Sequence, residues 1–328
     1  MKKNIINITK CVSFLLVLLC LLYGSSLLVM PKDNSESAGI HYVTAMGYLA
    51  EPENSMDVLF LGDSLVYSGI SPVYIWNEYG ITSYDCSIPS EKFSFANDFC
   101  KTFLEKQSPK VVFIETGVLF RELQEEDIAT FHVQQVLSVF SYHNRWKSLT
   151  KRDLNPKIDY TYIEPFRGYR LSTVTKPGKT NGYFSKTEET RHVSDKNFKY
   201  LKKLKAMCDE KGAKLIILSM PCQKNWNYKI HNGTVRAAIK LGIDYLDLNL
   251  LTVQDDGFAI NWDLDTRDKG EHLNNRGAEK VSEYLGKYIT AMGLTTDKRG
   301  TAGYESWNEA YVKLQDEIDA DMIKNAIK

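Results

Sequence analysis

The chain has 328 residues, of which 43% are hydrophobic and 12% aromatic, enough for one large α/β domain or two small ones with a substantial core. Lys and Arg together number 41, as do Asp and Glu, so the formal net charge is zero. No stretch gathers basic residues on one face, which excludes the electrostatic footprint of a nucleic-acid-binding protein. We therefore expect no nucleic-acid partner.

The first informative segment is the apolar run Cys11–Met30, which holds no charged residue and is long enough to cross a bilayer as a helix. Residues 1–10 contain three lysines and no acidic residue. The positive-inside bias then keeps residues 1–10 in the cytoplasm and sends the rest of the chain outward. The sequence predicts a single-pass signal anchor in the cell membrane with an extracytoplasmic domain.

Two other interpretations of this run are weaker. A cleaved signal peptide would use the small residues 24–26, but the apolar residues 27–30 follow them and no clear A-x-A site is present. A lipid anchor on Cys20 is rejected because two leucines precede it where a lipobox has small residues. Whether the first 30 residues stay attached is left open by the sequence.

Four cysteines lie beyond the apolar run, and an even number permits disulfides in an oxidising compartment. The sequence does not separate the possible pairings. The alternative is that all four are small core residues, which we favour because a domain of this size does not need covalent staples. They are Cys86, Cys100, Cys208 and Cys222.

Two segments flank the expected domain. In residues 31–56, the polar stretch 32–37 follows Pro31 and predicts a short stalk, after which apolar residues at helical spacing predict a lead-in helix. Residues 296–328 form a C-terminal helical extension that packs one face on the domain. The apolar residues on that face are Trp307, Tyr311, Leu314, Ile318 and Met322.

From Asp57 onward, short apolar runs alternate with amphipathic helical stretches, a pattern typical of a parallel sheet covered by helices on both faces. The predicted fold class is therefore α/β, with about five strands and an N-terminal transmembrane helix. The predicted strands are residues 57–61, 83–88, 110–115, 214–220 and 243–247.

Residues typical of helix ends support this assignment. Ser71 caps a predicted helix that has Pro72 at its first position and Gly80 just past its end. A second helix begins after Ser194 and ends at Gly212. Between the third strand and this helix lies a stretch of roughly 75 residues, which is too long for an ordinary connection. We interpret residues 120–193, approximately, as an insertion, either a cap or a plain helical subdomain.

The sharpest local feature is the string Gly62-Asp63-Ser64-Leu65, which directly follows the first predicted strand. A serine at the carboxyl end of a parallel strand lies where open α/β folds bind ligands. A serine hydroxyl is a poor nucleophile until a base removes its proton, so a histidine must reach it. Ser64 is the candidate nucleophile.

Of the six histidines, only His272 has a supporting context, and the other five are expected at the surface or in the core. It stands in the string DKGEHLN, just before a predicted helix. A carboxylate beside the imidazole fixes its tautomer and stabilises the imidazolium that forms during proton transfer. Asp268 is the candidate for that role, and Asp265 and Glu271 remain alternatives.

These two motifs together resemble the SGNH/GDSL hydrolases, which carry GDSL after the first strand and an acidic residue shortly before a histidine at the last core helix. The resemblance covers much of residues 57–293. It implies a flavodoxin-like three-layer sandwich at residues 57–295, a Ser-Asp-His triad formed by Ser64, Asp268 and His272, and ester hydrolysis or acyl transfer.

The chain departs from this family at two points. The acid usually stands three residues before the histidine, where this chain has Lys269, so Asp268 is one position further away. The family also adds a glycine and an asparagine from later loops to the oxyanion hole, and no Gly-x-Asn-Asp is present here. Ser64, Thr116 and Gly117 are the candidates for the hole, and losing one donor typically costs ~100-fold to ~1000-fold in rate.

Asn225 and Trp226 follow the fourth predicted strand, at the same edge as Ser64 in a parallel sheet. An amide and an aromatic ring there suit a sugar or a polymer headgroup, so both are candidate substrate-binding residues, although a surface loop without a ligand is the alternative. No metal or nucleotide motif is present in the sequence. Serine–histidine chemistry needs no cofactor, and none is expected.

The sequence thus predicts a serine esterase or O-acyltransferase that forms an acyl-enzyme on Ser64. An external location implies an acylated cell-envelope glycan or related polymer as substrate. The anchored layout also resembles that of SGNH proteins that work beside a membrane-bound acyltransferase. The alternative is a binding or scaffold protein that kept the fold and lost efficient catalysis.

Overall fold

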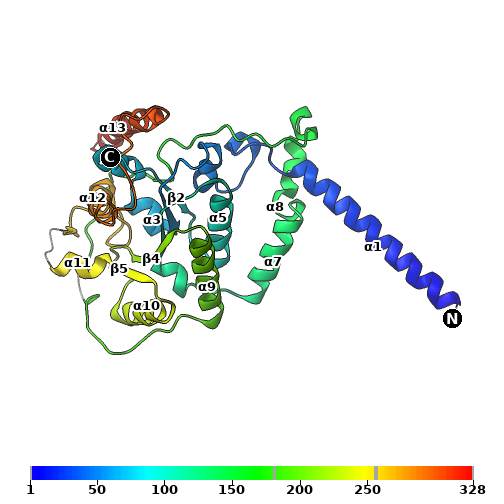
Figure 1. Cartoon of the computed structure of the whole chain (residues 1–328), viewed down its shortest axis with the longest axis horizontal. Coiled ribbons are helices and arrows are strands. Elements are labelled where there is room, and N and C mark those ends of the chain that lie inside the picture. Colours follow the sequence, from blue (N-terminus) through cyan, green and yellow to red (C-terminus); the bar gives the residue numbers. More distant parts are fainter. Residues whose placement is uncertain (1, 180–181, 255–257, 327–328) are drawn as a thin grey trace. The chain divides into compact units, whose positions relative to one another are not determined.

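The computed structural model describes residues 2–179, 182–254 and 258–326 (Figure 1). The chain divides into two compact units. Unit 1 comprises Met1–Val43 and Gln124–Tyr162, and unit 2 comprises Thr44–Leu123 and Ile163–Lys328. Unit 2 carries the sheet, and unit 1 carries the apolar N-terminal helix.

The sheet of unit 2 has five parallel strands in the order β2-β1-β3-β4-β5. This is the order of the flavodoxin-like doubly wound folds. Each predicted strand is present within two residues of its expected limits, so the predicted fold class is confirmed. The strands are β1 Val58–Gly62, β2 Ser83–Ser87, β3 Val111–Glu115, β4 Lys214–Ser219 and β5 Asp244–Asp247.

The central strands β1, β3 and β4 form because their apolar runs are buried on both faces, as expected of a parallel sheet between two helical layers. Their register aligns the carboxyl ends at one edge. Gly62 lies opposite Ser87, and Ser219 lies opposite Asp247. The residues that follow β1, β3, β4 and β5 therefore meet at a single edge of the sheet.

Helices cover both faces of this sheet, with α5 and α9 on one side and α3 and α12 on the other (Figure 1). The helix α13 packs on α4, which itself packs on α12. The elements of unit 2 after its lead-in are α3 Ser64–Gly69, α4 Pro72–Tyr79, α5 Phe93–Lys106, α6 Thr116–Phe120, α9 Asp195–Glu210, α10 Tyr228–Leu241, α11 Leu248–Gln254, α12 Asn275–Ala291 and α13 Glu305–Ala326.

The predicted helix boundaries are confirmed by their caps. The Ser71 hydroxyl accepts a hydrogen bond from the Tyr74 amide at 3.3 Å, and Gly80 ends α4 with φ of 65°. Ser194 caps α9 in the same way, and Gly212 follows that helix with φ of 68°. Both glycines adopt the left-handed conformation that closes helices.

The cysteines Cys86, Cys100, Cys208 and Cys222 are free and buried, so they are core residues. The C-terminal extension is helical as predicted. Trp307, Leu314 and Ile318 are buried on it. Met322, in contrast, is 57% exposed, although its neighbour Asp321 accepts a hydrogen bond from the Thr173 amide at 2.9 Å.

Unit 1 differs from the sequence-based prediction. The stretch after Pro31 was predicted as a stalk, but Lys32, Asp33 and Asn34 are buried. Asp33 accepts a hydrogen bond from the Thr161 amide at 2.8 Å, and Asn34 exchanges two hydrogen bonds with the backbone of Tyr162. These polar side chains therefore pair with a distant part of the chain, a contact that local composition does not reveal.

The predicted insertion at residues 120–193 is also divided, because residues 124–162 belong to unit 1 and residues 163–193 to unit 2. The remaining elements are α1 Lys2–Val29, η1 Glu36–Ala38, α7 Glu125–Val136, α8 Val139–Tyr142, η3 His143–Ser148 and η4 Lys151–Leu154 in unit 1, with α2 Val43–Met46 and η2 Gly47–Ala50 leading into β1.

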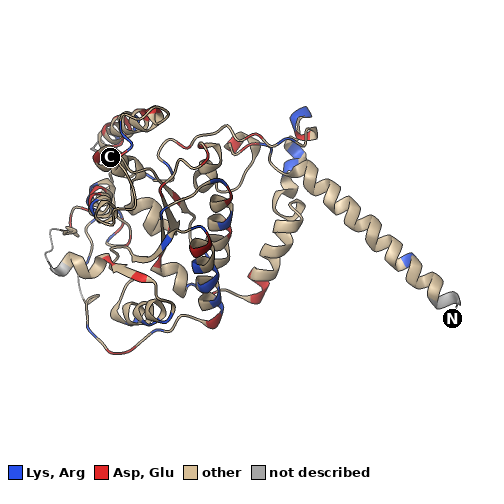
Figure 2. Ribbon diagram, in the orientation of Figure 1, with Lys and Arg blue, Asp and Glu red and all other residues tan. Residues whose placement is uncertain are grey.

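Within the described residues, α1 is the one helix long and apolar enough to cross a membrane. Its segment Ile5–Val29 has a mean hydropathy of 2.5. Charged side chains are nearly absent along it (Figure 2). This composition is compatible with a membrane anchor or with a signal sequence.

Candidate active site

Ser64 is positioned by the sharp turn between β1 and α3. It is the first residue of α3, and Asp63 caps the helix by accepting a hydrogen bond from the Leu65 amide at 3.0 Å. A Cβ atom at Gly62 would lie 2.4 Å from Val66 Cγ2 and 2.7 Å from Glu115 Cβ, so only glycine fits there. The Ser64 amide is in the first turn, where helix N–H groups have no partner within the helix.

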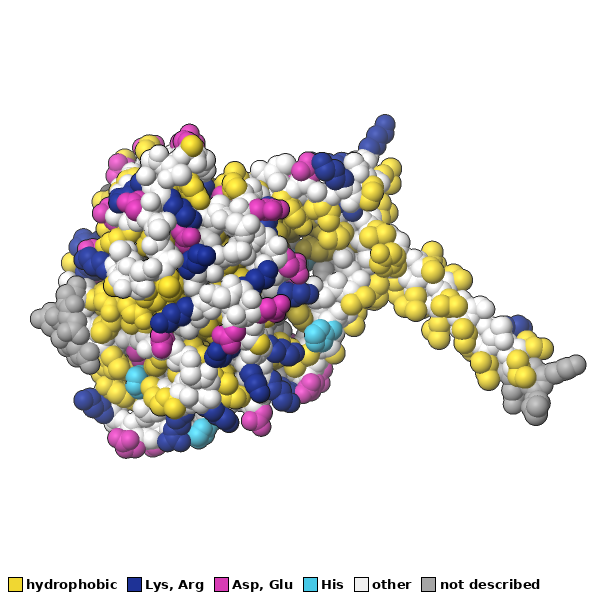
Figure 3. Space-filling model, in the orientation of Figure 1, with side chains coloured by type: hydrophobic (Ala, Val, Ile, Leu, Met, Phe, Trp, Pro, Cys, Tyr) yellow, Lys and Arg dark blue, Asp and Glu magenta, His cyan; other side chains and the backbone are white. Residues whose placement is uncertain are grey.

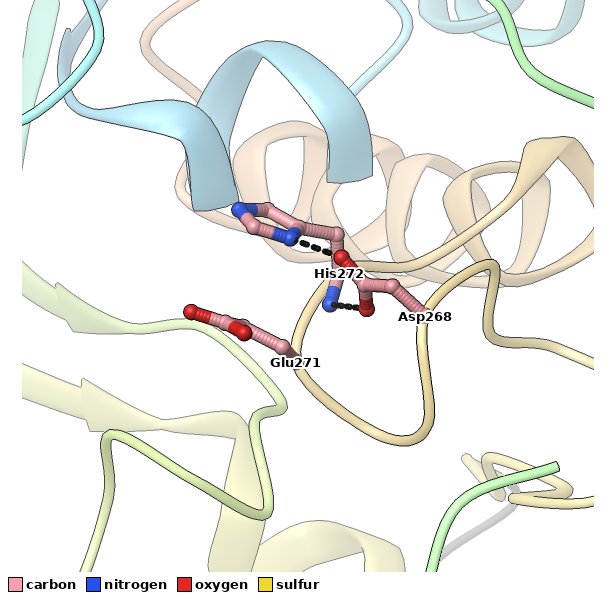
Figure 4. A group of neighbouring side chains, drawn as sticks. All are labelled: Asp268, Glu271 and His272. Atoms are coloured by element: carbon pink, nitrogen blue, oxygen red, sulfur yellow. Dashed lines mark hydrogen bonds and ion pairs between the residues drawn. The ribbon is translucent and has the colours of Figure 1, made fainter. Parts of the chain in front are cut away.

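The structure brings Ser64, His272 and Asp268 together. His272 Nε2 lies 2.7 Å from Ser64 Oγ, and His272 Nδ1 contacts Asp268 Oδ2 (Figure 4). The other oxygen of Asp268 accepts a hydrogen bond from the His272 amide at 2.7 Å. Because an ionised carboxylate only accepts, Nδ1 carries the proton and Nε2 is free to accept one from the serine.

The loop before His272 explains how an acid four residues away reaches the ring. Lys269 and Gly270 both adopt left-handed backbone angles, with φ of 69° and 86°. Thr266 and Leu273 face each other across an antiparallel bridge, which closes the loop. The extra residue relative to the family pattern is therefore taken up in the turn, and the Asp268 carboxylate folds back onto the imidazole.

The two alternative acids are engaged elsewhere. Asp265 is fully buried and pairs with Lys280 at 2.5 Å. Glu271 pairs with Lys224 at 3.0 Å. Burial acts to raise the pKa of Asp268, but the hydrogen bonds from the His272 amide and ring outweigh it and hold that pKa below its usual value. Asp268 is thus kept ionised beside the imidazole.

A pocket of about 220 Å³ opens beside Ser64, entirely within unit 2. Its wall is formed by the segments that follow β1, β2, β3 and β4 and by the loop before α12. The lining is largely polar, and Leu65, Met220, Trp226 and Ile230 are among its apolar side chains. The polar and charged side chains on it include Asp63, Ser90, Glu115, Thr116, Arg121, Ser219, Asn225 and Glu271.

Three ionisable side chains, Asp63, Glu115 and Arg121, line this pocket together. Arg121 forms an ion pair with Asp63, and the Glu115 carboxylate oxygen Oε2 accepts a hydrogen bond from the Gly117 amide at 2.6 Å. Burial, followed by the neighbouring charge of Asp63, raises the pKa of Glu115 to about 8. Glu115 is therefore neutral at pH 7, while the Asp63–Arg121 pair carries no net charge.

The three candidate residues for the oxyanion hole differ in whether they have a donor free to face the pocket. The Gly117 amide is already engaged by Glu115, so it does not point a free donor at the pocket. The Thr116 hydroxyl lines the pocket but contacts the Ser219 hydroxyl at 2.7 Å and the Leu218 carbonyl at 3.1 Å. The Ser64 amide is thus the candidate donor that the geometry favours.

Asn225 and Trp226 both line the pocket, as their position after β4 predicts. The Asn225 side chain is within 3.4 Å of Glu271 Oε1. Trp226 donates from its indole nitrogen to Asp247 Oδ2 at 3.0 Å, which fixes the ring as a wall of the pocket. Asn225 remains the more accessible of the two polar groups.

Asp268, Glu271 and His272 also offer possible metal-ligand atoms within 4.8 Å of one another (Figure 4). His272 and Asp268 are bound to each other, and Nε2 of the same ring faces Ser64. The Glu271 carboxylate forms an ion pair with Lys224. The donor set is therefore better suited to proton transfer than to holding a cation.

Sequence reasoning missed Asp63, Glu115 and Ser219 as residues of the pocket. The signal was present, because all three lie at or just beyond the carboxyl end of a predicted strand, where doubly wound folds place their sites. What the sequence did not contain was the side-chain direction at each strand end. That direction depends on the register and twist of the finished sheet.

No family model matches the chain, and no curated protein matches it. Solved structures similar to it include a GDSL-like lipase from Bacteroides thetaiotaomicron, at 12% identity and a TM-score of 0.39 over 76% of this chain and 96% of that one. An esterase from Pseudoalteromonas is 12% identical, with a TM-score of 0.37 over 73% and 99%. A lipase/acylhydrolase from Enterococcus faecalis is 13% identical, with a TM-score of 0.35 over 72% and 97%. Likeness this distant does not decide what the chain does.

Proposed function

We propose that the chain is a serine esterase or O-acyltransferase that acts on an ester-linked acyl group of a cell-envelope glycan or related polymer. The observation that carries this proposal is the continuous relay from Ser64 Oγ through His272 to Asp268. A serine, a base and an orienting carboxylate at these positions are the requirements for nucleophilic acyl transfer.

The reaction follows from the relay. His272 Nε2 takes the Ser64 proton as Oγ attacks the ester carbonyl, and the Ser64 amide faces the oxygen on which negative charge develops. The tetrahedral adduct then expels the alcohol, which receives its proton from His272, and leaves an acyl-enzyme on Ser64. A water molecule or a sugar hydroxyl attacks the acyl-enzyme, again losing its proton to His272. The bond between the acyl carbon and Ser64 Oγ then breaks, His272 returns the proton to Oγ, and a free acid or a new ester is released.

The pocket supports a short acyl group. A volume of about 220 Å³ with a mostly polar wall leaves little room for a long apolar chain. The envelope substrate is supported by α1, which has the length and composition of a membrane anchor. In this proposal residues 1–10 are cytoplasmic, unit 2 is extracytoplasmic, and a membrane-bound acyltransferase is a possible donor of acyl groups.

One observation favours a second candidate function, a binding or scaffold protein with weak or no catalysis. The Gly117 amide, which a complete oxyanion hole would use, is bound to Glu115. Under this alternative the pocket would recognise an acylated polymer for a partner acyltransferase without turning it over.

The test is covalent labelling of the full-length protein in membranes with a fluorophosphonate probe, which reacts with activated serines. The variants are Ser64→Ala and His272→Ala, with Ser90→Ala as a matched control because Ser90 also lines the pocket. We expect labelling of the wild type and of the control, and none of the other two. A folded wild type that is not labelled would favour the scaffold function.

A further inference from the structure

The last turn of α1 is built into the folded part of unit 1. Ser26 and Val29 are only 4% and 5% exposed. The Ser26 hydroxyl accepts a hydrogen bond from the Val139 amide at 3.1 Å, and Arg145 donates to the Val29 carbonyl at 2.5 Å. Lys32 donates to the Leu27 carbonyl at 2.7 Å. Arg145 from η3 and Lys32 thus satisfy carbonyl groups that the end of α1 leaves unpaired, and the Ser26 hydroxyl links α1 to the start of α8.

These contacts place α8 and η3 beside the last turn of α1, at residues 26–29. If α1 crosses a bilayer with its charge-free stretch, residues 26–29 lie near the membrane surface. The segments hydrogen-bonded to them then lie at the same level. They would also hold α1 in the folded protein, which favours an uncleaved anchor over a removed signal sequence.

The same segments expose large apolar side chains. Val133 and Val136 are three residues apart and share one face of α7, and Phe140 lies on α8, just beyond the break at residues 137–138. Hydrophobic side chains gather along α1 and around the end where it meets the rest of unit 1 (Figure 3). We call the following set the apolar rim, whose members are 46% to 73% exposed: Val133, Val136, Phe140, Trp146 and Leu154.

Cations accompany the rim. Residues 143–157 contain five basic side chains and a single acidic one, Asp153. Asp153 is buried and pairs with Arg145 at 2.7 Å, and Asp159 lies 3.9 Å from Lys157, so the cations that remain are Lys147, Lys151 and Arg152. Lys147 lies 5.8 Å from the centre of the Trp146 ring. Lys151 and Arg152 are exposed two to three residues before Leu154.

We propose that the apolar rim and its cations bind the headgroup region of an anionic lipid bilayer, on the side of the membrane where α1 ends. Exposed tryptophan and aliphatic side chains flanked by Lys and Arg are typical of membrane interfaces. Each such cation near an anionic surface strengthens binding by electrostatic attraction. The bilayer is favoured over a protein partner because α1 itself is 11% buried over its apolar window, so the rim continues a surface that already needs lipid.

This proposal rests on α1 spanning the membrane and is independent of the catalytic proposal. The test uses the full chain in nanodiscs, with Cys11→Ser and Cys20→Ser removing the exposed cysteines. A bimane label is attached through Val136→Cys, Trp146→Cys or Leu154→Cys. Ile239→Cys is the matched control, an apolar residue of unit 2 that is 76% exposed. Leu16→Cys reports on α1 itself.

Two quenchers separate the outcomes: a nitroxide lipid and aqueous iodide. In anionic discs we expect the nitroxide lipid to quench the three rim labels several-fold more than the label at position 239, with iodide showing the reverse order. Replacing the anionic lipid by a neutral one should weaken lipid quenching at 146 and 154 but not at 16.

Rim labels that behave like position 239 while position 16 is quenched by lipid would overturn the rim proposal alone. Loss of lipid quenching at position 16 would overturn the anchor and the rim together. Rim labels shielded from both quenchers would mean that protein covers them, which also overturns the proposal. Probe labelling of Ser64 in the same samples reports separately on the catalytic site.

Discussion

Among the described residues of unit 2, two histidine–aspartate pairs differ in what surrounds them. His272 contacts Asp268 through Nδ1 and Ser64 through Nε2. His231 contacts Asp247 at 2.7 Å, also through Nδ1. Asp247, however, accepts four further hydrogen bonds: from the Trp226 indole at 3.0 Å, from the Tyr245 hydroxyl at 2.6 Å, and from the backbone and side-chain amides of Asn249 at 3.0 and 3.3 Å.

The comparison shows that an ion pair with imidazole does not by itself make a catalytic site. Asp247 is a buried junction for several donors and fixes the wall of the pocket through Trp226. The Asp268 side chain is 36% exposed and contacts a single imidazole, that of His272. The other nitrogen of that ring, Nε2, faces the Ser64 hydroxyl. We therefore expect the His231–Asp247 pair to affect stability and the His272–Asp268 pair to affect turnover.

The largest expected effect is on turnover in His272→Ala. Removing the base leaves Ser64 as an unactivated hydroxyl, so kcat on a chromogenic acetyl ester should fall on the order of 10⁴-fold or more. His231→Ala is the matched control and should stay within about tenfold of the wild type. Steady-state kinetics of both variants tests this prediction. Equal losses of kcat in the two variants would contradict the proposed difference between the two histidine–aspartate pairs.

Asp268→Asn should lower kcat by about 10⁴-fold. The His272 amide holds the oxygen of the side chain, so the new amide nitrogen would face Nδ1 and force the ring proton onto Nε2. That tautomer does not accept a proton from Ser64. Glu271→Gln, on the same loop, should change kcat by less than about threefold, and the reverse ranking would make Glu271 the orienting acid.

Asp247→Asn should act on stability. The substitution replaces one acceptor oxygen by a donor and leaves at least one buried donor unpaired, which typically costs about 1–3 kcal/mol. Thermal unfolding of the full-length protein in detergent should show a lower Tm than for Asp268→Asn, whose side chain is partly exposed. A Tm equal to that of the wild type would show that the junction at Asp247 is not structural.

The smallest expected effect concerns Glu115 and pH. Because the fold raises its pKa from 4.5 to about 8, the stability that comes from burying the neutral carboxyl is complete below pH 4.5 and is lost as the pH rises through 8. Ionisation would also add a negative charge beside the reacting oxygen, so kcat/KM should fall about tenfold or less above pH 8.

Glu115→Gln removes that titration while keeping the shape of the side chain. Its pH–rate profile should therefore be flatter than that of the wild type on the alkaline side. Identical alkaline limbs would show that another group, and not Glu115, controls activity there.

Much of unit 2 could be predicted from the sequence because its signals are local. The parallel strands are continuous apolar runs, and Ser71, Gly80 and Ser194 mark helix ends by their own chemistry. Ser64 and His272 were found for the same reason. Asp268 was preferred only by proximity, and its selection over Asp265 needed the left-handed turn at Lys269 and Gly270.

The remaining features depend on distant contacts. Asp33 and Asn34 were expected in a stalk because they are polar, but they are buried against residues 161–162. Gly117 was expected to offer its amide to the substrate, but the Glu115 side chain reaches it first. In both cases the polar group is bound to a partner that lies close to it only in the folded chain, so its role could not be predicted from the local sequence.

The most direct test of the central claim is to trap the acyl-enzyme. Full-length protein turning over a chromogenic acetyl ester would be quenched in acid and digested, and its peptides analysed by mass spectrometry. We predict an acetyl group on the peptide that carries Ser64, absent from Ser64→Ala. Ester turnover with the acetyl group on a different residue, or with none on Ser64, would contradict the account.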